Sequence, residues 1–387
     1  MKNNNSSLSR RDFLQSGALA AVTVGVVPLA QQNDEKAELE QNIGKIRNFH
    51  RDMKYRRMGN TDVYLSALCL GGGDLANASV VYRAIDRGVN CVHVGYDYKN
   101  GKPMEVLAEV LKMKRDRLYV MLKDEFPRDA QGDLDVLLKM LGTDRVNFML
   151  YARHKAEEIA DEKIRGQFEK WKDQGKVSYC GISTHGDVKA CIGAAIDFGP
   201  YSLIHAALPQ AGMELAAEEL KKAKDRGIGI MPMKTMRDIK EEALQIAQFK
   251  KLLANPAVTA VNRGMRSMEM LETYLKAVRE TLTAAEDFSL FKHASQNRSE
   301  SCAMCGACER VCPQGIEIST LLRVKTYYLE QLGDRDMAVS AYRRLSGESR
   351  HDGNCTACGA CEAACPNGLR IVQKLEEATV QFRGLLA

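Results

Sequence analysis

Residues 302–313 read CAMCGACERVCP, and residues 355–366 read CTACGACEAACP. Both segments follow the pattern C-x2-C-x2-C-x3-C-P, in which three closely spaced thiolates hold one [4Fe–4S] cube and the fourth cysteine reaches a second cube. The pattern occurs twice with identical spacing and uses eight of the twelve cysteines. It therefore predicts two [4Fe–4S] clusters near the C-terminus, in a protein that moves single electrons.

The fourth cysteine of each run decides the expected ligand sets. The first cluster is expected to take Cys302, Cys305, Cys308 and Cys365, and the second to take Cys355, Cys358, Cys361 and Cys312. Gly306 and Gly359 allow the tight turns around each cube. A zinc site or a disulfide framework is the alternative, but zinc ligands usually come as paired C-x2-C units rather than as three-plus-one runs with a trailing proline.

The segment between the two runs indicates the architecture of the C-terminal part. Residues 318–332 and 335–345 carry helical periodicity. The arrangement resembles the all-helical two-cluster ferredoxin domain of fumarate reductase iron–sulfur subunits. The resemblance implies a mostly α-helical 2×[4Fe–4S] ferredoxin-like domain over residues 286–387.

The N-terminus carries a candidate export signal. Residues 9–14, SRRDFL, follow a polar and basic start and precede an apolar run at 17–30. The segment resembles the twin-arginine motif, and the run is shorter than the roughly 20 apolar residues that span a bilayer. We expect a signal peptide at 1–30, read by the twin-arginine translocase, a linker at 31–53, and a periplasmic or membrane-tethered protein. The alternative is a buried N-terminal helix after a chance Arg-Arg pair.

Composition excludes one class of partner. A net charge of +5 over 387 residues is modest, and no basic stripe with interleaved aromatic residues is present. Binding to nucleic acid is therefore not expected. The four cysteines outside the two runs lie in apolar patterns typical of core thiols.

From about residue 55 to residue 278, eight short apolar runs alternate with amphipathic helical stretches. The expected strands are 65–70, 90–94, 119–123, 146–151, 178–183, 203–207, 228–233 and 258–261. The expected helices are 78–87, 102–113, 133–141, 159–174, 188–198, 213–226, 242–253 and 267–278. Eight βα units of this length predict an α/β (β/α)8 TIM barrel at 54–285. A doubly wound open sheet would need a G-x-G-x-x-G turn after the first strand, and GGGD at 71–74 is not that turn.

Three segments of the barrel carry a family resemblance. YRRMGNTDVYLS at 55–66 is similar to R-x-L-G-x-T-G-x-x-V-S, LGTDRV at 141–146 to L-G-x-D-Y-V, and GKVSYCGIS at 175–183 to G-K-I-R-Y-I-G-V-S. In this order they resemble the aldo-keto reductase family, in the branch that carries a C-terminal iron–sulfur domain. The resemblance implies an oxidoreductase built on a TIM barrel.

The same resemblance makes NADP(H) a candidate cofactor. RGMRS at 263–267 is similar to the family's segment that grips the cofactor's adenosine phosphate, which implies roles for Gly264, Arg266 and Ser267, together with Ser183 on the fifth strand. The Gln and Asn that contact the nicotinamide in the family are His205 and Pro209 here. Ordinary hydride transfer from NADPH is therefore not expected.

The family's catalytic tetrad is expected to be incomplete. Tyr98 and Lys123 fall at the Tyr and Lys positions, whereas the Asp and His positions hold His93 and Ala152. Without its carboxylate, Lys123 is expected to lower the pKa of Tyr98, and Lys123, His93 and either His154 or Arg153 to accept an anion.

Four histidines are expected at the barrel mouth, where the active sites of these barrels lie. They follow or end strands at positions 93, 154, 185 and 205. The mouth is then basic and rich in groups that titrate near neutrality, with Tyr98, Lys123, His93 and His154 as catalytic candidates. The alternative is a set of scattered, structurally satisfied histidines.

Together these features predict an exported iron–sulfur oxidoreductase. Its barrel would bind a small carbonyl or carboxylate-bearing organic substrate, and its clusters would exchange electrons with a redox partner protein or a membrane quinone or cytochrome chain. One alternative is an NADP-dependent aldehyde or ketone reductase with accessory clusters. The other is a non-catalytic electron-transfer subunit with a degenerate barrel.

Overall fold

The computed structural model describes residues 37–75, 77–127, 129–130, 132–331, 333–345 and 354–386. The twin-arginine segment at 9–14 lies outside these residues. Within the described ranges, no helix has both the length and the apolar composition needed to cross a bilayer.

The first barrel-associated element is an antiparallel hairpin of β1 (Tyr55–Arg57) and β2 (Tyr64–Ser66). The expected strand 65–70 is interrupted after Ser66 and resumes as β3 (Leu68–Gly71). Ser66 explains the break, because its amide donates to Asn90 Oδ1 at 2.8 Å and its hydroxyl donates to the Leu68 carbonyl at 2.7 Å. These bonds replace the ladder contacts that a continuous strand would make.

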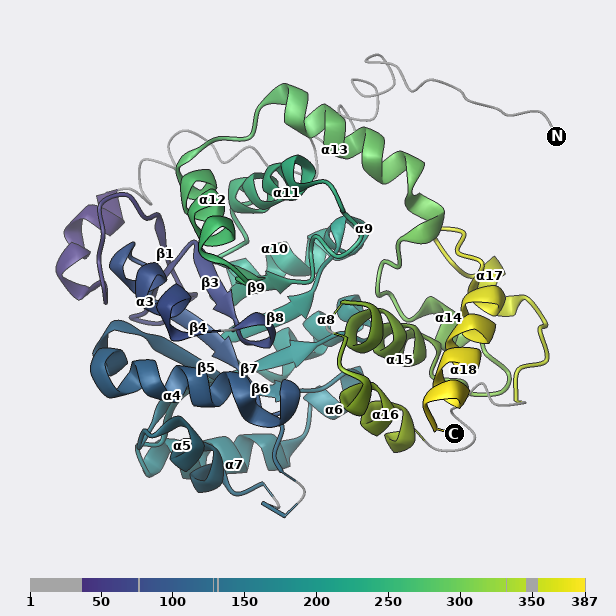
Figure 1. The fold of residues 1–387 in the computed structure, drawn as a ribbon, viewed down its shortest axis with the longest axis horizontal. Helices are drawn as coiled ribbons and strands as arrows, with labels where there is room; N and C mark the ends of the chain where they lie inside the picture. The colour runs from purple at the N-terminus through teal and green to yellow at the C-terminus, as the bar shows by residue number, and fades with distance from the viewer. Residues whose placement is uncertain are drawn as a thin grey trace.

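Eight parallel strands form a nearly closed barrel in the order β10-β3-β4-β5-β6-β7-β8-β9 (Figure 1). The seam between β9 and β10 is bridged by the Thr259 amide, which donates to the Ile230 carbonyl at 2.8 Å. The strands after β3 are β4 (Cys91–Val94), β5 (Tyr119–Lys123), β6 (Val146–Ala152), β7 (Val177–Thr184), β8 (Leu203–Ala207), β9 (Gly229–Met233) and β10 (Val261–Gly264).

The outer layer consists of helices that pack on the strands. They are α3 (Ala78–Asp86), α4 (Lys102–Lys114), α5 (Leu134–Leu141), α6 (Ala156–Ile159), α7 (Glu162–Asp173), α8 (Val188–Phe198), α9 (Gln210–Leu215), α10 (Ala217–Asp225), α11 (Glu242–Ala254) and α12 (Met268–Arg279). The expected helix 213–226 is divided between α9 and α10, and the expected helix 159–174 corresponds to α7, which begins three residues later. The eighth strand begins at Val261 rather than at 258, because Val261 is the first residue in register with β3, opposite Leu68.

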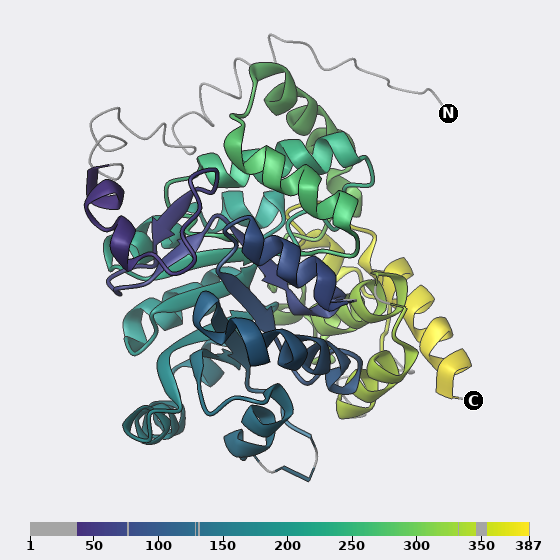
Figure 2. The same ribbon diagram turned by 60° about the vertical axis from the view of Figure 1, so that its left-hand side comes forward.

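The chain leaves the barrel through α13 (Ala284–Gln296), which leads to a separate group of helices (Figures 1 and 2). Leu290 of α13 is buried with Ala247 of α11, so α13 packs on the barrel although the expected domain boundary lies within it. The C-terminal helices are α14 (Ala307–Arg310), α15 (Ile318–Arg323), a π-helix at Val324–Gln331, α16 (Arg335–Arg344), α17 (Ala360–Ala363) and α18 (Ile371–Leu386), and they share their own apolar core.

The C-terminal region docks on the mouth of the barrel. Arg237, which follows β9, donates to the Cys302 carbonyl at 2.7 Å. The amide of Val188, which follows β7, donates to the Met304 carbonyl at 3.0 Å. Both contacts come from segments at the C-terminal ends of barrel strands, where active sites of this fold lie. The first cysteine loop therefore lies against the catalytic end of the barrel.

Candidate active site at the barrel mouth

A buried ion pair joins Lys123, at the end of β5, to Asp97, in the segment after β4. Both side chains are almost completely buried, at 4% and 6% exposure. The expectation that Lys123 lacks a carboxylate partner was therefore wrong. Counting residues along the family pattern pointed to His93, but the loop after β4 folds back and brings Asp97, the neighbour of Tyr98, to the lysine. Burial alone lowers the pKa of Lys123, yet Asp97 outweighs it and holds that pKa above its usual value.

Tyr98 lies beside this pair. Lys123 Nζ is 4.6 Å from the centroid of the Tyr98 ring, and the phenol is 5% exposed. Burial, reinforced by the Asp97 carboxylate, raises the pKa of Tyr98 well above 10. The expected lowering of this pKa was wrong, because Asp97 neutralises the ammonium that was to cause it. Tyr98 is thus held as a neutral phenol that can donate a proton.

His93 and His205 form one pair of rings on the floor of the mouth, with centroids 4.5 Å apart. His205 Nε2 is 2.8 Å from Asn262 Nδ2, and His205 Nδ1 is 3.3 Å from Ser183 Oγ. If the Asn262 amide donates to Nε2, the proton on Nδ1 is directed to Ser183. Ser183, expected to contact a cofactor, is fully buried in this network.

The second pair, His154 and His185, lies after β6 and β7, with ring centroids 5.2 Å apart. Burial lowers the pKa of all four mouth histidines, and nearby cations lower it further; the pKa of His205 falls to about 3. The expectation of groups titrating near neutrality was wrong, because these rings are enclosed and neutral. Arg153 is also unavailable as an anion site, since it pairs with Asp124 at 2.9 Å.

Tyr327, from the π-helix of the C-terminal region, completes the site. It lines the same cavity as Tyr98 and His93. Lys234, just after β9, places Nζ 3.4 Å from the centroid of the Tyr327 ring. No sequence signal marked Tyr327, because it lies on a helix far along the chain. Asp97 did carry a signal, since it is a carboxylate next to the expected catalytic tyrosine.

The remaining expected cofactor contacts lie between β10 and α12. Gly264 packs so closely on Asp74 that an added Cβ would lie 2.2 Å from Asp74 Oδ2. Arg266 Nε pairs with Asp74 at 3.0 Å, and Ser267 caps α12 by accepting the Met270 amide at 3.1 Å. Gly264 and Arg266 border the cavity at the mouth, whereas Ser267 has a structural role in the helix start.

The eight motif cysteines separate into two small cavities. One cavity is lined by Cys302, Cys305, Cys308 and Cys365, and the other by Cys312, Cys355, Cys358 and Cys361. The fourth cysteine of each run thus lies with the first three cysteines of the other run. Among the described residues, no three Cys, His, Asp or Glu side chains converge closely enough to hold a single metal ion. Each cavity suits a cube, which holds its thiolates further apart than one zinc ion does.

The backbone of the two loops is shaped in the same way. Met304 and Ala357, at equivalent positions, have φ angles of 58° and 51°, and their amides donate to Cys302 Sγ and Cys355 Sγ, both at 3.4 Å. Gly306 and Gly359 follow with φ angles of 64° and 75°. Left-handed backbone that directs N–H groups at sulfur is what a thiolate-bound cluster needs.

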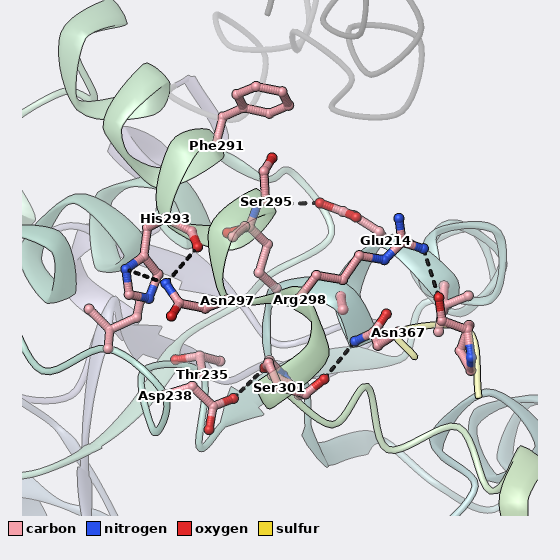
Figure 3. A pocket seen from close by; sticks show the side chains of 17 residues that line it. Glu214, Thr235, Asp238, Phe291, His293, Ser295, Asn297, Arg298, Ser301 and Asn367 are labelled. Carbon is pink, nitrogen blue, oxygen red and sulfur yellow. Dashed lines mark hydrogen bonds between the residues drawn. The ribbon is translucent and has the colours of Figure 1, made fainter. Parts of the chain in front are cut away.

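A larger cavity lies at the seam between α9, α13 and the cysteine loops (Figure 3). Ser301 donates to Asp238, and Asn367 donates to the Ser301 carbonyl at 2.6 Å, so the residues beside Cys302 and Cys365 form one wall. None of the mouth residues Tyr98, Lys123 or Asp97 lines it. We therefore place the chemistry at the smaller cavity beside Tyr98.

Comparison with known families agrees with this geometry. A model of the aldo/keto reductase family matches residues 74–238, and a model of a 4Fe–4S dicluster domain matches residues 294–366. The chain joins an aldo-keto reductase barrel to a 4Fe–4S dicluster domain. It is therefore an iron–sulfur oxidoreductase. No curated protein matches the chain significantly.

Solved structures with the same fold are aldo-keto reductases. The holo form of an aldo-keto reductase from Bacillus halodurans superposes with a TM-score of 0.54 and 18% identity, over 62% of this chain and 96% of that one. A putative aldo-keto reductase from Pseudomonas aeruginosa gives 0.50 and 18%, over 58% and 95% of the two chains. A thermostable aldo-keto reductase bound to the inhibitor epalrestat gives 0.50 and 20%, over 62% and 100%. At these identities the likeness concerns the barrel fold alone.

Proposed function

We propose that this iron–sulfur oxidoreductase interconverts a small carbonyl compound and its alcohol, and that the electrons pass through two [4Fe–4S] clusters instead of NADP(H). The observation that carries the proposal is that Tyr98 of the barrel and Tyr327 of the cluster-bearing region line one cavity. One site is thereby built from both domains. Conversion of a carbonyl to an alcohol takes two electrons and two protons. Two bound clusters supply or accept the electrons one at a time, Tyr98 exchanges the proton of the substrate oxygen, and solvent water exchanges the proton of the carbon.

The barrel residues transfer the proton of the substrate oxygen. Tyr98, whose pKa is raised by burial, keeps its proton and can donate it to the substrate oxygen. Lys123 lies over the Tyr98 ring and, together with Asp97, holds the ring in place. In the direction of oxidation the Tyr98 phenolate accepts the proton.

The cysteine cavities suggest the direction of the electron path. We assign Cys302, Cys305, Cys308 and Cys365 to the first cluster, and Cys355, Cys358, Cys361 and Cys312 to the second. The loop of the first set packs on the barrel through Arg237. Cys358 of the second set is exposed. Electrons would therefore be exchanged with a redox partner protein, or with a membrane quinone or cytochrome chain, at the second cluster.

Anaerobic spectroscopy tests the electron source. NADPH should leave the visible absorbance of the oxidised clusters unchanged, and reduced viologen should bleach it and support carbonyl reduction. Bleaching by NADPH, with tight NADPH binding, would instead favour the NADP-dependent reductase that Gly264 and Arg266 at the mouth would serve. Bleaching by viologen without turnover of any carbonyl compound or alcohol would favour a non-catalytic electron-transfer subunit.

Export is tested separately. Replacing Arg10 and Arg11 with Lys should leave folded, cluster-containing protein in the cytoplasm, because the twin-arginine route reads that pair. Cell fractionation followed by iron analysis measures the distribution. A matched change of Arg51 and Arg57 to Lys, outside the signal, should not alter it. Equal export of the signal variant would contradict the twin-arginine assignment.

A further inference from the structure

The mouth cavity contains three buried polar atoms for which no hydrogen-bond partner is present among the described residues. It is bordered by the segments after β3, β9 and β10 and by Tyr327. The three atoms are His93 Nε2, Lys234 Nζ and Asn262 Oδ1. Buried polar groups in folded proteins nearly always have partners, and a cluster of unpaired ones in a cavity indicates a ligand.

Lys234 is the most unusual of these groups. Its backbone has a φ of 55°, a left-handed conformation that costs free energy for a residue with a side chain and is often found at functional sites. The conformation directs the side chain inward, where Nζ lies over the Tyr327 ring. Burial, together with Arg323 and Lys123, holds the pKa of Lys234 well below its usual value. Since Nζ has no hydrogen-bond partner among the residues that the structure describes, an ammonium in this position calls for a bound anion.

The charges around the cavity point to the same conclusion. The basic residues that line the cavity are Lys234, Arg237, Arg263 and Arg266. Asp74 is the one carboxylate among its described lining residues, and it is paired with Arg266. Asp97 acts on Lys234 through its charge, but its Oδ2 is paired with Lys123. Within the part of the chain that the structure describes, Lys234 Nζ thus has no carboxylate bonded to it.

We infer that Lys234 binds the carboxylate of the substrate, which makes the substrate a small oxo acid, or the corresponding hydroxy acid, whose carbonyl carbon lies beside Tyr98. Lys234 packs on Tyr327, and both line one cavity with Tyr98, so the carboxylate subsite and the proton donor share that cavity. The inference rests on the proposed function for the carbonyl, but the anion site is testable without turnover.

The test compares pyruvate with acetone, which has a methyl group in place of the carboxylate. Titration calorimetry on the cluster-loaded full chain should show pyruvate binding and little acetone binding. Lys234→Met should weaken pyruvate binding about tenfold or more, the effect of losing a hydrogen bond to a charged group. The exposed Lys240→Met is the matched control and should bind pyruvate as the wild type does. Visible absorbance of the clusters checks that each variant is folded.

A second measurement needs no variant. Because burial lowers the pKa of Lys234, an anion beside it should raise that pKa, and pyruvate binding should take up protons, seen as a binding enthalpy that differs between buffers. Equal pyruvate binding by Lys234→Met and wild type, or no binding at all, would overturn the inference. The inference would also be overturned if 2′-phospho-ADP-ribose bound more tightly than pyruvate and Lys234→Met abolished that binding. Lys234 would then bind a phosphate of a dinucleotide instead of a substrate carboxylate. A Tyr98→Phe variant that keeps pyruvate binding and full turnover would refute the proposed function and leave the anion site standing.

Discussion

Replacing Tyr98 with Phe is expected to slow carbonyl reduction about a hundredfold or more, because positioned general acids contribute roughly 10²–10⁴-fold to rates. The phenol is the one proton donor that Lys123 and Asp97 are arranged to support. The substitution removes a single oxygen and keeps the ring on which Lys123 packs. Iron content and cluster absorbance should therefore match the wild type, while turnover with reduced viologen as electron donor falls.

Tyr82→Phe provides the matched control, since the Tyr82 hydroxyl makes one long bond, at 3.4 Å, to the Glu109 carbonyl on the outer helices. It should keep wild-type turnover. The pH profile gives an independent check. Because burial raises the pKa of Tyr98, the phenol stays protonated as pH rises past 10. The rate of carbonyl reduction should therefore not fall in mildly alkaline buffer through loss of the Tyr98 proton. Full turnover in Tyr98→Phe would show that the barrel does not work through this tyrosine.

The barrel could be predicted from the sequence because its parallel strands are buried on both faces. Such strands appear as short, continuous apolar runs, and those at 119–123 and 203–207 match β5 and β8 to the residue. The strand predicted at 258–261 was misplaced because apolar residues indicate burial, whereas a strand is defined by backbone pairing with a neighbouring strand. Val258 is buried, but pairing with β3 starts only at Val261.

The active site was predicted in position but not in chemistry. Tyr98 and Lys123 follow from their places after strands, whereas the partner of Lys123 depends on how the loop after β4 turns. His154 and His185 follow β6 and β7, whereas His93 and His205 lie within β4 and β8. The protonation of all four depends on enclosure, which no local pattern reports. Tyr327 covers the mouth from the other domain, so only the docking of the two domains brings it to Tyr98.

This docking also shows how a degenerate set of family residues can still enclose a cavity beside Tyr98. The family pattern would place the carboxylate at His93 and a histidine at Ala152. Here Asp97, also a barrel residue, supplies the carboxylate that pairs with Lys123. The cavity is lined by Tyr327 of the C-terminal region as well as by barrel residues. The loss of ordinary tetrad positions therefore fits a site that has become dependent on the cluster-bearing region.

The second large effect is expected from Cys365→Ala. The change should remove the cluster of the first run, so that iron falls from about eight to about four atoms per chain. Cys365 lies in one cavity with Cys302, Cys305 and Cys308, although it belongs to the second run in sequence. That cavity borders the barrel, and its loop is held by Arg237. Losing this cluster should therefore abolish electron transfer to the mouth even though the second cluster stays intact.

Paired spectra decide the assignment. The electron paramagnetic resonance spectrum of reduced Cys365→Ala should match that of Cys302→Ala, and the spectrum of Cys312→Ala should match that of Cys355→Ala, because each pair removes a ligand from one cluster. Cys191→Ala, a buried thiol of α8 outside both cavities, should retain the full iron content. A Cys365→Ala spectrum that matches Cys355→Ala instead would place each cluster within its own run. The electron path from an exposed second cluster to a first cluster at the barrel would then fail as well.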